Sequence, residues 1–349
     1  MKYRVLGTTG MMVSPICMGT MTFGRPLDEG QSKNLVGYAL DQGVNFFDTA
    51  NVYEGYDRKV GSKGGVSEGF LGQAIVKRRQ DVVICTKLGN PSGTGPLDAG
   101  LSAHHLELEL DLSLKRLKTD WVDLVLAHRW HSEIPMEEVW RVFDRWVRAG
   151  KARAVGVSNW PTWRMAQASE IARRNGWPTV SVSSPKYSLM TRGIELDHVP
   201  CARHYGVGLV TYQALEGGAL SGKYQRGQPP PAGSRGEEKP EWMPARDDVL
   251  MEKLDALQKL SQEAGMSVLE YVLAWTLSQQ GISSVITGLR NRSQLDAAIE
   301  AAGKSIPPEH LSRIDAVFPR PKPVGGDQVL SWGDGGWVLE DIERPPFGP

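Results

Sequence analysis

The sequence predicts an α/β protein, and within that class a single (β/α)8 TIM barrel with an N-terminal β-hairpin and extra helices. Short β-rich runs alternate with longer segments that carry apolar residues at helical spacing. The alternation yields eight strand-helix units, and parallel strands joined by right-handed crossovers close naturally into a barrel at that number. The alternative is an open doubly wound sheet. No Gly-x-Gly-x-x-Gly follows any strand, so the usual dinucleotide-binding turn of that fold is missing.

The expected elements follow one another along the whole chain. The strands are residues 14–19, 45–47, 82–86, 122–127, 152–157, 180–183, 207–212 and 284–286, and the helices of the alternation are 31–42, 67–77, 102–117, 136–149, 161–174, 194–205 and 293–302. Helices at 248–265 and 267–278 give one helix more than the alternation requires. The Pro-, Gly- and charge-rich segment 225–240 is expected to be an excursion above the barrel. We expect the barrel to cover residues 1–320 and an irregular C-terminal tail, 321–349, to pack on it.

Composition narrows the class of partner. The 40 basic and 40 acidic residues balance, so no net charge draws the chain to nucleic acid or to an anionic membrane. Cys17, Cys85 and Cys201 are far apart, which argues against a disulfide framework. Neither a signal peptide nor a run of roughly 20 apolar residues is present, so we expect a cytoplasmic protein with a small-molecule partner. The sequence does not determine whether the chain is a monomer or a homo-oligomer.

Four residues that can handle protons lie where predicted strands stop. Asp48 and Tyr53 follow the run 44–47, Lys87 follows 82–86, and His128 follows 122–127. In a parallel α/β protein these strand ends share one face, where active sites are built. Each residue alone has a structural explanation: Asp48 as a turn cap, Tyr53 as a rim aromatic, Lys87 as a solvated charge and His128 as a hydrogen-bonded loop histidine. Their joint spacing favours a catalytic site.

With Ser158-Asn159 after the fifth strand and the turn 19–24 after the first, these four residues resemble the aldo-keto reductases, over roughly residues 1–320. The opening 3–7 and the segment 217–224 are most similar to the branch that contains the potassium-channel β subunits and related bacterial reductases. The resemblance implies hydride transfer from a reduced nicotinamide to a carbonyl carbon.

In that chemistry the carbonyl oxygen must receive a proton, and Tyr53 is the expected donor. The Lys87 ammonium would lower the pKa of the phenol, Asp48 would hold the ammonium, and His128 would orient the carbonyl.

The resemblance also implies a set of cofactor-binding residues. Ser158 and Asn159 would bind the nicotinamide carboxamide, and Tyr212 would stack on the ring. Ser184 stands where the family usually has Gln, Gln213-Ala214-Leu215 replaces the usual Ser-Pro-Leu, and Ala297 and Ala298 replace a common Glu and Asn. The full expected cofactor set is Gly19, Thr20, Met21, Asp48, Ser158, Asn159, Ser184, Tyr212, Gln213, Ala214, Leu215, Gly217, Lys223, Arg235, Gly288, Arg290 and Gln294.

Within this set, Lys223, Arg235 and Arg290 are expected to surround phosphates, because a 2′-phosphate is best gripped by forked positive donors. This expectation favours NADPH/NADP+ over NADH.

The loops after the strands are expected to form a pocket for a flat or apolar carbonyl compound. Its expected residues are Phe23, Tyr56, Trp130 and Trp160. The segment 54–65 is interpreted either as a cover over the site or as a solvated loop. No metal is expected, because His128 and His131 have too few further ligands near them in the sequence.

The sequence therefore predicts an NADPH-dependent reductase of aldehydes or ketones, with a cofactor-binding regulatory subunit of a membrane protein as the alternative.

Overall fold

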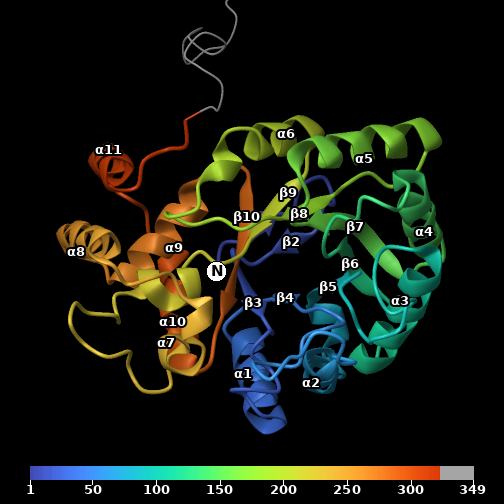
Figure 1. Ribbon diagram of the computed structural model, residues 1–349, viewed down its shortest axis with the longest axis horizontal. Coiled ribbons are helices and arrows are strands. Elements are labelled where there is room, and N and C mark those ends of the chain that lie inside the picture. The colour runs from blue at the N-terminus through green and yellow to red at the C-terminus, as the bar shows by residue number, and fades with distance from the viewer. Residues whose placement is uncertain (323–349) are drawn as a thin grey trace, which may run out of the picture.

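A computed structural model of the chain, which describes residues 1–322, contains a closed barrel of eight parallel strands (Figure 1). In spatial order the strands are β10 (Ile282–Gly288), β3 (Ile16–Gly19), β4 (Phe46–Asp48), β5 (Val83–Leu88), β6 (Val122–Ala127), β7 (Ala152–Ser158), β8 (Val182–Ser184) and β9 (Gly208–Thr211). The predicted (β/α)8 barrel is thus confirmed, and closure of the sheet excludes the open doubly wound alternative.

Helices surround the barrel, as right-handed crossovers between parallel strands require (Figure 1). They are α1 (Glu29–Asp41), α2 (Val66–Ile75), α3 (Ala103–Leu117), α4 (Met136–Arg148), α5 (Thr162–Asn175), α6 (His198–Tyr205), α7 (Arg235–Glu238), α8 (Asp248–Glu263), α9 (Val268–Ser278), α10 (Arg292–Ala301) and α11 (Pro308–Val317). Short 3-10 helices are η1 (Arg79–Asp81), η2 (Gly193–Glu195), η3 (Glu216–Ser221) and η4 (Pro240–Trp242).

The N-terminal hairpin closes one end of the barrel. Strands β1 (Arg4–Val5) and β2 (Met12–Val13) pair antiparallel, which confirms the predicted hairpin. Leu6 and Val13 are fully buried and pack with the residues that fill the barrel interior. One guanidinium nitrogen of Arg4 donates to the carbonyls of Leu277 and Ile282, at 2.8 and 3.0 Å, and thereby ties the hairpin to the end of α9 and the start of β10.

The core has two layers. Side chains that point inward from the strands, among them Cys17, Phe46 and Cys85, fill the barrel. A larger layer lies between the strands and the helices, where Trp140, Trp146 and Trp275 are almost completely buried. Because strand side chains alternate between two buried layers, the strands read in the sequence as nearly continuous apolar runs.

Three segments differ from the sequence prediction. The expected helix 194–205 is split into η2 and α6, since the chain turns at Leu196 and Asp197. The expected linker 225–240 contains α7 and leads into η4. Helix α11 was not predicted, although Pro308 at its first turn and the apolar spacing of Leu311, Ile314 and Val317 are sequence signals for it.

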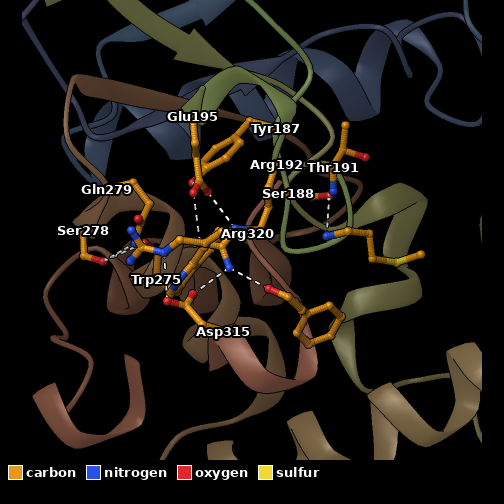
Figure 2. A network of polar contacts seen from close by, with 12 residues as sticks. Tyr187, Ser188, Thr191, Arg192, Glu195, Trp275, Ser278, Gln279, Asp315 and Arg320 are labelled. Carbon is orange, nitrogen blue, oxygen red and sulfur yellow. Dashed lines mark hydrogen bonds and ion pairs between the residues drawn. The ribbon is translucent and has the colours of Figure 1, made fainter. Parts of the chain in front are cut away.

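A buried arginine joins α11 to the loop after β8 (Figure 2). Arg192 donates to both carboxylate oxygens of Glu195, at 2.7 and 3.0 Å, and to Asp315 on α11, at 2.7 Å. The same side chain donates to the carbonyl of Phe318, just beyond α11, at 2.7 Å. The Arg192 guanidinium therefore helps to fix the end of α11 to the barrel, together with the buried side chains of Ile314 and Phe318.

The expected C-terminal tail, 321–349, lies almost entirely outside the described residues, which end at Lys322. Within residues 1–322, no helix combines the length and the apolar character needed to cross a membrane.

Candidate active site

Three of the four predicted catalytic residues sit at the carboxyl ends of adjacent strands. Asp48 is the last residue of β4, Lys87 is next to the last residue of β5, and His128 directly follows β6. Strands β4, β5 and β6 are hydrogen-bonded neighbours in the barrel, and the backbone amide of His128 donates to the carbonyl of Leu88 at 2.8 Å. The parallel register therefore carries all three side chains to one end of the barrel.

Lys87 connects these residues to Tyr53. Its Nζ donates to Asp48 Oδ1 at 2.5 Å, to the carbonyl of Thr49 at 3.0 Å and to the Tyr53 hydroxyl at 3.3 Å. The Tyr53 ring meets the His128 ring edge to face, with 5.9 Å between the centroids. The four predicted side chains thus lie in one contiguous cluster.

Burial and charge decide the protonation states in this cluster. Burial alone would lower the pKa of Lys87, but the adjacent Asp48 carboxylate, with Tyr53 and Cys85, raises this pKa above its ordinary value. Burial raises the pKa of Tyr53, and the opposing effect of Lys87 is smaller, so the phenol stays protonated at neutral pH. This finding differs from the expectation that Lys87 would bring the pKa of the phenol down toward neutral pH. Burial, with Lys87, Arg129 and Arg58, lowers the pKa of His128 well below its usual range, which leaves a neutral imidazole.

A polar network supports the loop between Asp48 and Tyr53. The side-chain amide of Asn51 donates to Glu109 at 2.6 Å, and the backbone amide of Asn51 donates to the carbonyl of Lys87 at 3.1 Å. Glu109 also accepts from Ser92 at 2.8 Å and lies 3.8 Å from Arg116. This network was not predicted from the sequence, although Asn51 lies within the same short motif as Asp48 and Tyr53.

The residues expected to hold the nicotinamide end adjoin this cluster. Ser158 and Ser184 are paired at the ends of β7 and β8, and the Ser158 hydroxyl donates to the carbonyl of Ser184 at 3.0 Å. The Asn159 side chain donates to the carbonyl of His128 at 3.2 Å and accepts from the Tyr212 hydroxyl at 2.5 Å. The Ser184 hydroxyl is buried and has no partner among the described residues, so it is free to bind a ligand.

The turn after β3 adjoins the active site through its backbone more than through its side chains. Gly19 pairs with Asp48 on one side and with Gly288 on the other. The hydroxyl of Thr20 donates to the carbonyl of Asp48 at 3.1 Å, and Met21 is partly exposed. The side chain of Thr20 is therefore already occupied in holding the end of β4.

The segment after β9 folds into a compact turn. Gln213 has a positive φ of 64°, and its side chain accepts from the backbone amide of Gly217 at 2.9 Å. Ala214 is buried and Leu215 is partly buried within this turn. Gly217 has φ of 69°, a conformation that strains any other residue, and a Cβ there would lie 2.8 Å from the sulfur of Met243, so that side chain would have to shift.

The three cations expected near phosphates lie in two groups. Arg235, on α7, and Arg290, after β10, both donate to the hydroxyl of Tyr56, at 2.9 and 2.7 Å. Arg290 also pairs with Glu238 at 2.9 Å, and its backbone amide donates to the side chain of Gln294 at 2.9 Å. Lys223 is exposed, with its ammonium 5.3 Å from the ring centroid of Tyr224.

The four aromatic residues expected in a substrate pocket are mostly buried. Phe23 is fully buried in the outer core, because the turn after β3 directs it inward, and therefore it does not face an open pocket. Tyr56 is buried beside Arg235. Trp160 is buried and meets the partly exposed Trp130 edge to face, with centroids 4.9 Å apart. Of the four, Trp130 has the accessibility that a substrate contact requires.

The donor set fits a nicotinamide dinucleotide. Ser184 offers an unpartnered buried hydroxyl at the inner end, and Arg235 and Arg290 offer forked donors for phosphate at the outer end. Within residues 1–322, no cluster of three or more His, Cys, Asp or Glu side chains is arranged to hold a metal ion.

Comparison with known proteins agrees with this geometry. The model of the aldo/keto reductase family matches residues 15–318. The chain belongs to the aldo/keto reductase family. It is 34% identical to the uncharacterized oxidoreductase YrpG of Bacillus subtilis, over 95% of this chain and all of that protein. It is 35% identical to a probable voltage-gated potassium channel subunit beta of Oryza sativa, over 91% of this chain and 96% of the relative.

A putative voltage-gated potassium channel subunit beta of Schizosaccharomyces pombe is 33% identical, over 90% of this aldo/keto reductase and 93% of the relative. The predicted family and branch are confirmed, and membership supports an oxidoreductase activity.

Proposed function

We propose that this protein reduces an aldehyde or ketone to an alcohol with NADPH, and that Tyr53 is the proton donor. The observation that carries the proposal is the position of the Lys87 ammonium, which bonds to the Asp48 carboxylate and to the Tyr53 hydroxyl at the end of the barrel. The chemistry that a bound nicotinamide supplies is hydride transfer to the carbonyl carbon.

The protein's own residues supply the proton and the orientation. A carbonyl oxygen placed beside Tyr53 and His128 accepts a hydrogen bond from each, because the phenol is protonated and a neutral imidazole keeps one N–H. As negative charge develops on the oxygen, Tyr53 transfers its proton, and Lys87 stabilises the phenolate that remains. Asp48 keeps the ammonium in place through the reaction.

The test compares the wild type with Tyr53→Phe and measures loss of NADPH absorbance with a panel of aldehydes and ketones. We expect the variant to lose roughly 100-fold or more in turnover, the usual contribution of a positioned general acid, and to bind NADPH with nearly unchanged affinity. Tyr3→Phe is a matched control, since Tyr3 donates to the carbonyl of Gly43 at the opposite end of the barrel. A fully active Tyr53→Phe enzyme would remove the proposed proton donor.

A second candidate function is that of a cofactor-binding regulatory subunit of a membrane protein. The similarity to proteins described as potassium channel β subunits favours it. Rapid carbonyl reduction by the isolated protein supports the enzyme. A stable complex with a membrane protein, combined with negligible turnover across the panel, supports the regulatory subunit.

A further inference from the structure

Tyr56 contacts three other segments of the chain. It belongs to the loop between β4 and α2, and its backbone amide donates to the carbonyl of Arg25, at 2.9 Å, in the loop after β3. The residue is only 2% exposed. The hydroxyl reaches across to Arg235 on α7 and to Arg290 after β10, and both guanidinium groups donate to it.

These contacts place two guanidinium groups side by side. Their central carbons lie 5.4 and 5.2 Å from the centroid of the Tyr56 ring, within the range of cation–π attraction. Two adjacent positive charges repel each other, and the structure offsets this repulsion with the phenol and with Glu238, which is 2.9 Å from Arg290. The proton of the Tyr56 hydroxyl has no acceptor within residues 1–322.

We propose that Tyr56 is a positioning residue for cofactor selection, which holds Arg235 and Arg290 in the arrangement that binds one phosphate monoester. A phosphate placed between the two guanidinium groups accepts from the terminal nitrogens of Arg235, which Tyr56 leaves free by accepting only from Nε. It also accepts from the N–H groups of Arg290 that the Tyr56 hydroxyl, Glu238 and the Gly233 carbonyl leave unpaired. The inference rests on the proposed NADPH-dependent function and deepens it, because NADPH has a 2′-phosphate where NADH has a hydroxyl. In this proposal Tyr56 acts on the choice of nucleotide, whereas its place in the sequence predicts a substrate-pocket residue.

The competing explanation is that Tyr56 only fills space. Its ring meets Trp242 of η4 edge to face, with centroids 5.3 Å apart, and phenylalanine would preserve that contact. The substitution Tyr56→Phe therefore removes the hydroxyl and keeps the packing. Tyr271→Phe is a control at another buried tyrosine, because the hydroxyl of Tyr271, on α9, lies 3.0 Å from Nδ1 of His310 on α11.

The experiment measures dissociation constants for NADPH, NADH and 2′,5′-ADP by isothermal titration calorimetry, with thermal melts to verify folding. We expect Tyr56→Phe to weaken NADPH and 2′,5′-ADP by roughly tenfold, as loss of one charge-assisted hydrogen bond does, and to change NADH by less than about twofold. Tyr271→Phe should leave the ratio of the NADPH and NADH constants unchanged. The compound 2′,5′-ADP carries the phosphate without the nicotinamide, so this result does not depend on turnover.

The outcomes separate this inference from the proposed function. If the wild type binds NADPH more tightly than NADH and Tyr56→Phe leaves that ratio unchanged, the role of Tyr56 is refuted while the reductase proposal stands. The same applies if both nucleotides weaken equally, which indicates a general structural role. If the wild type binds neither nucleotide, both proposals fall.

Discussion

Replacing Lys87 with methionine tests how strongly the stability of the protein depends on the buried ion pair between Lys87 and Asp48. Methionine retains an unbranched apolar side chain and removes the ammonium. Asp48, which is 3% exposed, then loses the group that accounts for its 2.5 Å contact. Burial already raises the pKa of Asp48 against the opposing effect of Lys87, so removing Lys87 raises this pKa further.

The magnitude follows from the cost of neutralising Asp48. The ordinary pKa of an aspartate is near 4, about 3 units below pH 7. Protonating it at pH 7 therefore costs about 4 kcal/mol. Removing one partner of a buried pair typically costs about 3 to 5 kcal/mol. We therefore expect Lys87→Met to lower the free energy of unfolding by about 4 kcal/mol at pH 7. The double variant Asp48→Asn/Lys87→Met should recover at least about 2 kcal/mol of that loss, because no carboxylate remains to be neutralised.

Urea unfolding followed by tryptophan fluorescence at pH 7 and pH 5 provides the assay. In Lys87→Met the folded state binds more protons than the unfolded state between the unfolded pKa and the raised folded pKa of Asp48. Its stability should therefore rise as pH falls through that window. Lys151→Met, which removes an exposed partner of Asp111, is the control and should cost less than about 1 kcal/mol. A Lys87→Met loss that is the same at both pH values, or a double variant no more stable than the single one, would refute the reasoning.

Two further predictions concern ion pairs away from the active site. Arg192→Met leaves Glu195 and Asp315 without their shared partner (Figure 2), and we expect a loss of about 3 kcal/mol in chemical denaturation; a change below about 1 kcal/mol would contradict it. For Glu270, the hydrogen bonds from Lys304 and Ser267 outweigh burial and lower the pKa to about 2, so its stabilisation is present above pH 4.5 and disappears as pH falls toward 2. Glu270→Gln should cost about 1 to 2 kcal/mol at pH 7 and almost nothing near pH 2.5 in thermal unfolding, and an equal cost at both pH values would count against this assignment.

The barrel and the ends of its strands could be predicted from the sequence because they depend on local signals. The run before Asp48 and the run before His128 are apolar and bounded, and a parallel fold places their ends on one face without any knowledge of distant contacts. The clustering of Asp48, Lys87 and His128 follows from that topology alone. Tyr53 joins them because it follows Asp48 closely in the sequence, near the start of the loop between β4 and α2.

The direction of the pKa shift of Tyr53 could not be predicted from the sequence. The sequence shows that Lys87 can approach the phenol, but it does not show how deeply the phenol is buried. In the structure burial has the larger effect and Lys87 the smaller one, so the pKa rises. The balance between desolvation and charge depends on packing from several strands, and no single motif records it.

The structure of the loops was even harder to predict from the sequence. Segment 225–240 is recognised in the sequence only by its composition, which does not predict α7. The position of Tyr56 in a loop after a strand favours a substrate pocket and does not predict its contacts with Arg235 and Arg290. The structure of these segments depends on contacts between distant parts of the chain. Arg235 bonds to Tyr56, 179 positions away in the sequence, and Arg290 bonds to Tyr56 across 234 positions. Contacts at such separations are invisible to periodicity and to local propensity. If Tyr56 does set the preference for NADPH, then the catalytic residues of this barrel are specified by its strands, while its choice of nucleotide is specified by three segments outside the strands that can vary without disturbing them.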